Sequence, residues 1–156
     1  MRTQLSLFTL LSILALLAVS CGGRPKSGED AQVNTLGTVE VTARLVEVPE
    51  GAVFHRELYD YATILKYEVI AVHRGALEKG LMIYVGHYDP WKPRAEAADQ
   101  RAKNIGGNSR QFRAGQLQRM ALATPMDDFF MGGIVDKYFG QHAGPSYWAL
   151  WTNDAD

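Results

Sequence analysis

Cysteine is almost absent from this chain, since Cys21 is the only one among 156 residues. A single cysteine excludes a disulfide framework and a zinc site built from cysteine pairs, so packing alone must hold the folded core together. A strong charge of one sign is also absent, because 16 Lys and Arg residues oppose 17 Asp and Glu residues. Such an even balance creates no field that would attract nucleic acid, and we expect no nucleic-acid partner.

Sequence motifs with a well-defined catalytic mechanism are missing as well. The chain has no Gly-rich phosphate loop, no His-Glu-x-x-His, no Gly-x-Ser-x-Gly and no Cys-x-x-Cys. With 47% hydrophobic and 21% charged residues, it has the composition of an ordinary globular protein, and its length suits one domain. We therefore expect a single non-enzymatic domain that requires no cofactor.

A long apolar run occurs at the N-terminus, where residues 5–19 follow Arg2. The run is short for a membrane span and is typical of the hydrophobic part of a signal peptide. Two small residues, Ala18 and Ser20, lie just before Cys21. This sequence resembles the lipobox of bacterial lipoproteins, in which the cysteine receives a lipid and becomes the first residue of the exported chain.

The lipoprotein resemblance implies a signal peptide over residues 1–20 and lipidation of Cys21 by diacylglycerol and a further acyl chain such as palmitate. Two or three acyl chains anchor a protein firmly, whereas one chain holds it only marginally. The resemblance places the protein in the cell envelope, on a periplasmic or surface face. Gly22 in place of Asp after the cysteine favours the outer membrane in a Gram-negative host. An ordinary cleaved signal and an uncleaved anchor are the alternatives.

The remaining chain divides into a tether and a domain. Residues 21–36 are polar and rich in glycine and charge, which predicts a flexible tether below a domain over residues 37–156. The centre of that domain is a predicted hairpin between residues 59 and 88, with its turn at Gly75–Gly80. Alternate residues of its first strand are apolar from Tyr61 to Ala71, as in a half-buried strand. In its second strand we expect an inward row of Leu81, Ile83, Val85 and His87.

Three further strands are predicted over residues 38–48, 112–124 and 147–152, with a bulge at Leu45–Val46 in the first. The first hairpin strand, residues 61–74, would span roughly 46 Å if straight, whereas a domain of this size has a radius of gyration of about 13 Å. The strand must therefore coil, as strands do in a small barrel.

Two connections between these strands have a helical composition. The alanine-rich residues Arg94–Asn104 predict a helix on the surface, between the third and fourth strands. Residues Met126–Gly140 predict either a short helix capped by Asp127 or Asp128, or an aromatic loop, and we favour a helical turn after Gly133.

Three strands, a helical insertion and two more strands resemble the five-stranded OB-like β-barrel, including the netrin-like domains of secreted proteins. The resemblance covers most of residues 37–156 and lies in the pattern of strands, since the chain lacks the cysteines of netrin-like domains. A β-sandwich is the alternative fold.

Aromatic residues near the end of the hairpin are the main candidates for binding. Aromatic faces beside hydrogen-bond donors suit a sugar ring or an apolar group of a protein partner. The candidate binding residues are Tyr84, Tyr88, Trp91, Lys92 and Arg94. In the alternative interpretation these rings are covered and complete the core.

The sequence thus favours a membrane-anchored, non-catalytic binding or accessory module for a protein partner or an envelope polysaccharide. A different hypothesis is a metal-assisted hydrolase in which His73, His87 and Asp89 hold the metal. A third is an accessory domain of an envelope assembly that has no small ligand.

Overall fold

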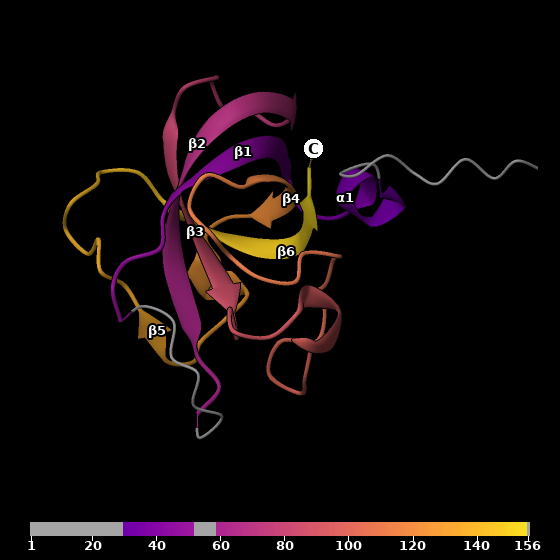
Figure 1. Ribbon diagram of the computed structural model, residues 1–156, viewed down its shortest axis with the longest axis vertical. Helices are drawn as coiled ribbons and strands as arrows, with labels where there is room; N and C mark the ends of the chain where they lie inside the picture. Colours follow the sequence, from indigo (N-terminus) through magenta and orange to yellow (C-terminus); the bar gives the residue numbers. More distant parts are fainter. Residues whose placement is uncertain (1–29, 52–58, 156) are drawn as a thin grey trace, which may run out of the picture.

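The computed structural model of the protein describes residues 30–51 and 59–155. Within these ranges the chain forms six strands, one short helix and two 3-10 turns (Figure 1). In chain order they are α1 (Ala31–Thr35), β1 (Val39–Glu47), β2 (Ala62–Arg74), β3 (Met82–Tyr88), η1 (Arg94–Glu96), β4 (Leu117–Ala123), η2 (Met126–Asp128), β5 (Ile134–Val135) and β6 (Ser146–Asp154). Cys21 and the predicted signal peptide lie outside the described residues.

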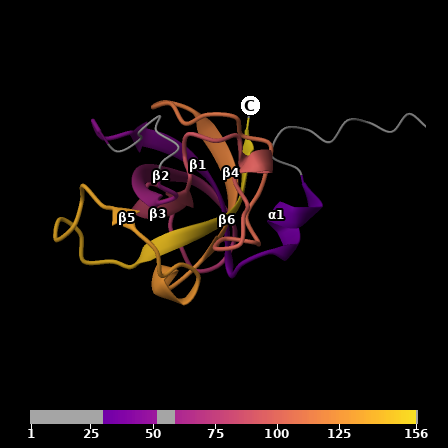
Figure 2. The same cartoon turned by 90° about the horizontal axis from the view of Figure 1, so that it is seen from below.

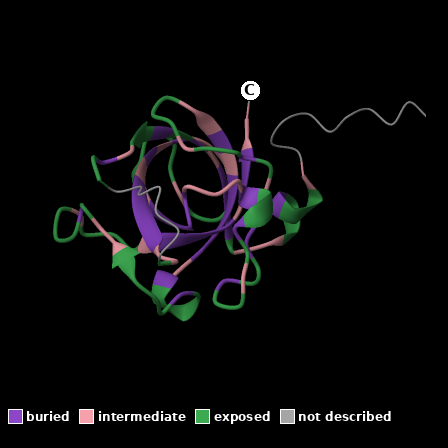
Figure 3. Ribbon diagram, turned by 60° about the horizontal axis from the view of Figure 1, so that its bottom comes forward, coloured by how far each residue is buried: buried purple, intermediate pink, exposed green. Residues whose placement is uncertain are grey.

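Five of the strands close into a barrel. β1 pairs with β2 on one side and with β4 on the other, and the order continues through β6 and β3 back to β2. Neighbouring strands are antiparallel except β3 and β6, which are parallel. Figure 3 looks into this barrel and shows that much of its wall is buried. The predicted five-stranded OB-like barrel is confirmed, and the β-sandwich alternative is wrong.

The long strand β2 coils so that it can pair with two neighbours in turn. Residues Ala62–Glu68 pair with β3, and residues Lys66–Arg74 pair with β1. Figure 1 shows β2 bending over one end of the barrel. The β1–β2 pairing shifts register between Leu45 and Glu47, where the sequence predicted a bulge.

Hydrophobic residues form one cluster inside the barrel and a second outside it. The inner cluster takes alternate residues from all five strands, including Leu65, Val85 and Met120. The outer cluster covers the other side of β2, β3 and β6 with residues of the connecting segments. The predicted inward positions Ile83, Val85 and His87 are confirmed as buried, but Leu81 is 44% exposed because it lies in the turn before β3.

The predicted helix over Arg94–Asn104 is wrong, because only the short turn η1 forms there. The carboxylate of Asp99 accepts hydrogen bonds from the backbone N–H groups of Arg101 at 2.7 Å and Ala102 at 3.1 Å. Such local side-chain bonds compete with helix formation and override the helix propensity of alanine. Ala97 and Ala102, expected on the surface, are buried.

The segment between β4 and β6 also differs from the prediction. Pro125, and neither aspartate, precedes η2 at the capping position, and no side chain caps the turn. After Gly133 the chain forms β5, which pairs in parallel with the start of β2, in place of the expected helical turn. The aromatic-loop alternative was closer to the structure.

Residues 30–36, which belong to the tether predicted over residues 21–36, are folded. Asp30 accepts a hydrogen bond from the backbone N–H of Gln32 at 2.7 Å and thereby caps α1. Val33 is fully buried, and α1 packs against β4 and β6. In residues 30–51 and 59–155, no helix has the length and apolar character needed to cross a membrane.

Candidate ligand-binding groove

A groove of about 710 Å³ lies on the outside of the barrel, between α1, the connection from β3 to β4, and β6. Figures 1 and 2 show α1 and this connection on the same side of the barrel as β6. Phe129, just after η2, also lines the groove. The volume lies within the range of small-molecule sites, and the two walls and the floor of the groove come from distant parts of the sequence.

The α1 wall presents Gln32 and Leu36 to the groove. Arg74, the last residue of β2, holds this wall in place by donating to the backbone carbonyls of Val33, Asn34 and Leu36. Carbonyls at the end of a helix lack partners within the helix and need such donors. One arginine therefore fixes the short helix against the barrel.

Asp99 and Tyr88 fix the wall formed by residues 97–106. The Tyr88 hydroxyl donates to Asp99 at 2.7 Å, in addition to the two backbone bonds at Arg101 and Ala102. Burial raises the pKa of the Asp99 carboxyl, but these hydrogen bonds outweigh it, so the pKa is below its ordinary value. The carboxylate stays charged and keeps the edge of the groove in one conformation.

The floor of the groove belongs to β6, with Trp148, Leu150 and Trp151. A Cβ atom on Gly106 would lie 2.4 Å from the Trp151 ring, so only glycine allows this close packing. The N–H of Gly106 donates to Leu150 at 2.9 Å, and the N–H of Thr152 donates to Gly106 at 2.9 Å. The connection is thereby attached directly to the floor.

The side chains at the groove combine flat apolar rings with polar groups. Phe129 is 43% exposed, and Trp151 is half-buried. The polar side chains that line the groove are all exposed, namely Gln32, Gln100, Arg101, Lys103 and Asn104. None of the described lining residues is acidic. The groove can therefore stack a flat ring and hydrogen-bond to its substituents.

Two of the predicted binding residues, Tyr88 and Arg94, are buried, and their predicted role in binding is corrected to a structural one. The Arg94 guanidinium donates to the backbone carbonyls of Tyr88 at 2.7 Å, Asp89 at 2.5 Å and Lys92 at 3.0 Å. Burial lowers the pKa of Arg94 to about 10, so it remains charged at neutral pH. Arg94 thus shapes the turn after β3 from inside.

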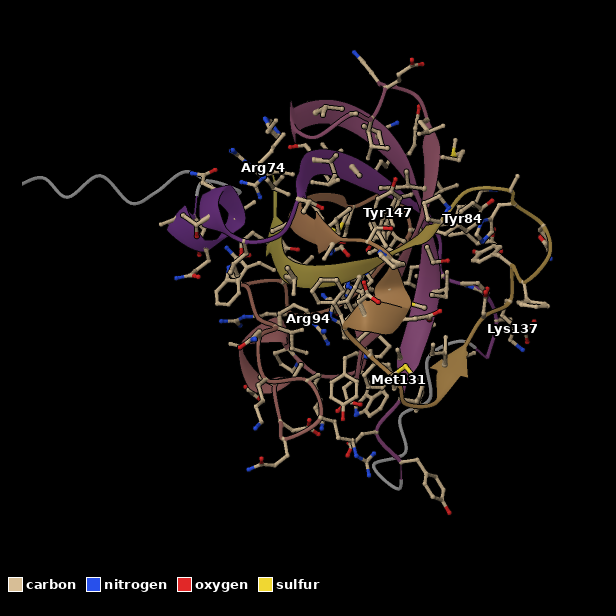
Figure 4. The ribbon with its side chains drawn as sticks, turned by 180° about the vertical axis from the view of Figure 1, so that it is seen from behind. Arg74, Tyr84, Arg94, Met131, Lys137 and Tyr147 are labelled. Atoms are coloured by element: carbon tan, nitrogen blue, oxygen red, sulfur yellow. The ribbon has the colours of Figure 1, made fainter. Side chains whose placement is uncertain are left out.

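The other three predicted binding residues do not share one surface. Tyr84 stacks on His142, with ring centroids 3.9 Å apart, and Figure 4 shows Tyr84 and Arg94 on different parts of the molecule. Trp91 packs on Tyr61 at 4.6 Å, and the Lys92 ammonium lies 5.7 Å from the Trp91 ring. A binding role for Tyr84, Trp91 and Lys92 stays a prediction.

The predicted metal ligands are not brought together. His87 is buried inside the barrel and lies 3.0 Å from the Tyr67 hydroxyl, whereas His73 contacts Thr42 near the other end of β2. Asp89 is buried and pairs with Lys92 at 2.6 Å. Among the residues the structure describes, no candidate metal cluster contains a histidine. The metal site predicted from His73, His87 and Asp89 is therefore wrong.

Three carboxylates, Asp60, Asp89 and Asp99, do approach one another within 4.8 Å. Lys92 lies among them, 2.6 Å from Asp89 and 3.5 Å from Asp60. Burial raises the pKa of Asp89, and the Lys92 ammonium opposes that effect without cancelling it. Lys92 therefore neutralises part of this acidic cluster through ion pairs with the buried Asp89 and the partly exposed Asp60.

His87 belongs to a polar chain inside the barrel. The Tyr67 hydroxyl donates to Gln118 at 2.8 Å, and the Gln118 amide donates to Ser109 at 2.9 Å. Since the Tyr67 proton is used, we assign the His87 Nε2–H as the donor to the Tyr67 oxygen. Burial lowers the pKa of His87 well below its ordinary value, so the ring is neutral. These hydrogen-bonded side chains fill part of the barrel interior and offer no accessible reactive group.

The groove was not anticipated from the sequence. The residues that form it come from α1, the β3–β4 connection, η2 and β6, and no short motif joins them. One signal was present: Gly106–Gly107, interpreted as a helix stop, marks the close approach of the connection to β6. The glycine pair could be matched with Trp151 only once the position of β6 was known, because the two segments are far apart in the sequence.

Comparison with known proteins gives no relative from which a role could be taken. No family model matches the chain, and neither the curated proteins nor the solved structures include a significant match.

Proposed function

We propose that this protein is a lipid-anchored, non-catalytic binding module of the bacterial cell envelope, and that it holds an envelope glycan in the groove between α1, the β3–β4 connection and β6. The lipobox-like sequence ending at Cys21 supports the anchor and the location on a periplasmic or surface face. Gly22 after the cysteine supports the outer membrane in a Gram-negative host.

The observation that carries the proposal is the combination of side chains at the groove. Phe129 and Trp151 offer ring faces, and the amides of Gln32, Gln100 and Asn104 offer both donors and acceptors. Sugar rings have apolar faces and hydroxyl edges, which match these two kinds of group. The polar lining residues are exposed, so the groove is open to solvent at its edges. An open groove can hold one part of a longer glycan chain whose ends extend beyond it.

The test is glycan-array binding of the full chain in detergent micelles, with a comparison of Phe129→Ala and Phe139→Ala. Phe129 lines the groove, whereas Phe139 is 88% exposed and lies outside it. We expect Phe129→Ala to weaken binding about tenfold, which corresponds to about 1.4 kcal/mol, and Phe139→Ala to leave it unchanged. Equal affinity of the two variants would remove the groove from the proposal.

A protein partner is the second candidate, supported by apolar side chains on the segment between η2 and β6. Met131 and Phe139 are each 88% exposed. Large apolar side chains exposed together on one segment are typical of a surface that binds another protein. If this segment binds a protein, Phe139→Ser should abolish co-purification of that partner while Phe129→Ala preserves it. The opposite pattern would favour the groove.

A further inference from the structure

The positive charge at the groove is local. The whole chain has a net charge of −1, yet the two charged residues that line the groove, Arg101 and Lys103, are both cations. Lys103 is exposed and forms no ion pair within the described part of the chain. Arg101 is 64% exposed and lies 3.9 Å from Asp60, a long and solvated contact that a ligand can replace.

From this arrangement we propose that the groove binds an acidic oligosaccharide, one that carries carboxylate or phosphate groups along its chain. The inference rests on the proposed glycan-binding function and specifies the class of ligand. Rings of the ligand would stack on Phe129 and Trp151, and its anionic groups would face Lys103 and Arg101 along the edge formed by residues 100–104.

The backbone of the floor argues against a peptide as the occupant. Peptides commonly bind by adding a strand to a free sheet edge or by pairing with exposed backbone groups. β6 already pairs with β3 on one side and β4 on the other. The backbone of Gly106 also hydrogen-bonds to the Leu150 carbonyl and to the Thr152 N–H. Recognition in this groove is left to side chains, which is how hydroxyl-rich ligands are bound.

The position of the cations is set by the fold. Arg101 and Ala102 have their backbone N–H groups bound by Asp99, and Ala102 is buried, so Lys103 has to project from this turn. Asn104 follows it, and Ile105 is buried. The backbone that carries the two cations is therefore already ordered, and binding does not have to order a mobile loop first.

The experiment measures binding of the full chain in detergent micelles to oligogalacturonate, to poly(glycerol phosphate) and to an uncharged maltooligosaccharide. The variants are Lys103→Gln and Arg101→Gln, and the matched control is Lys79→Gln, an exposed lysine in the β2–β3 turn. We expect one or both acidic polymers to bind and the neutral one to bind far more weakly. Each groove variant should weaken acidic binding about fivefold and reduce its dependence on salt, while Lys79→Gln does neither.

The outcomes separate this inference from the proposed function. Equal binding of neutral and acidic oligomers that is lost in Phe129→Ala overturns the acidic class and leaves glycan binding in the groove intact. Binding to none of the three polymers, together with no effect of Phe129→Ala on the glycan array, overturns both. Stronger binding to phosphatidylglycerol vesicles than to phosphatidylcholine vesicles, lost in Lys103→Gln and seen without binding to either acidic polymer, also overturns the inference, because it makes lipid headgroups the ligand; the acyl anchor contributes equally to both kinds of vesicle.

Discussion

Arg94 shows how one buried polar residue can define a turn. It was predicted to bind a ligand because it stands beside aromatic residues. Its guanidinium is instead buried away from solvent and donates hydrogen bonds to three backbone carbonyls. A sequence cannot distinguish a cation that faces a ligand from one that faces the backbone, because both stand beside aromatic residues and turns. The distinction depends on which way the chain leaves β3.

We expect Arg94→Ala to lower the free energy of unfolding by about 3 kcal/mol, because it leaves buried carbonyls without donors. Urea unfolding of the variant and the parent measures the change. Arg101→Ala is the matched control, since Arg101 is 64% exposed and its loss should cost less than about 0.5 kcal/mol. Similar values for the two variants would contradict the structural role of Arg94.

His87 makes stability depend on pH. Burial keeps the folded ring neutral, with a pKa well below 6.5, while the unfolded chain takes up a proton near pH 6.5. The unfolded state then binds more protons, so stability is complete above about pH 6.5 and falls as the pH drops below it, by up to about 1.4 kcal/mol per pH unit. The partly exposed His73 has a pKa shift of the same sign, caused mainly by burial.

We expect His87→Gln to flatten the fall of stability between about pH 6.5 and pH 5, because glutamine does not titrate and keeps a polar contact for Tyr67. Thermal unfolding at a series of pH values measures the slope. His73→Gln should leave most of the slope in place. A parent protein whose stability does not change in this range would show that His87 is accessible and titrates normally.

Among the elements, the β3–β4 connection departs most from its local preferences. Its alanines favour a helix, yet Asp99 takes the N–H groups that the helix would use, and Ala97 and Ala102 are buried against the barrel. Burying apolar surface and satisfying backbone groups outweighs the few tenths of a kcal/mol that propensity contributes per residue. The strands were predicted well because apolar and polar residues alternate along a strand that buries one face.

Gly107 and Gly115 provide a test of how closely this connection approaches β6. Both have positive φ, +127° and +90°, but a Cβ on Gly107 would lie 1.9 Å from the Thr152 carbonyl oxygen, whereas nothing lies within 4 Å of one on Gly115. We expect Gly107→Ala to cost about 3 kcal/mol or more and Gly115→Ala about 1 kcal/mol in chemical denaturation. Equal losses would mean that the close approach to β6 does not exist.

At the scale of the whole molecule, the proposed membrane anchoring depends on Cys21. We expect Cys21→Ser to move the protein from the membrane fraction to the soluble fraction, because the acyl chains provide the anchor. Mass spectrometry of the parent should find the chain starting at residue 21 with added lipid. An intact Met1 or a free thiol on Cys21 would contradict the lipoprotein prediction.

The sequence by itself determined the barrel, since alternating apolar residues can bury one face only as strands, and a strand as long as β2 fits this domain only if it coils. Tertiary structure decided the candidate site. The groove exists because α1, the β3–β4 connection and β6 meet there, held by Arg74, Asp99 and the Gly106 contact. Contacts between residues so far apart in the chain leave no local pattern, because each depends on the position of every strand between them.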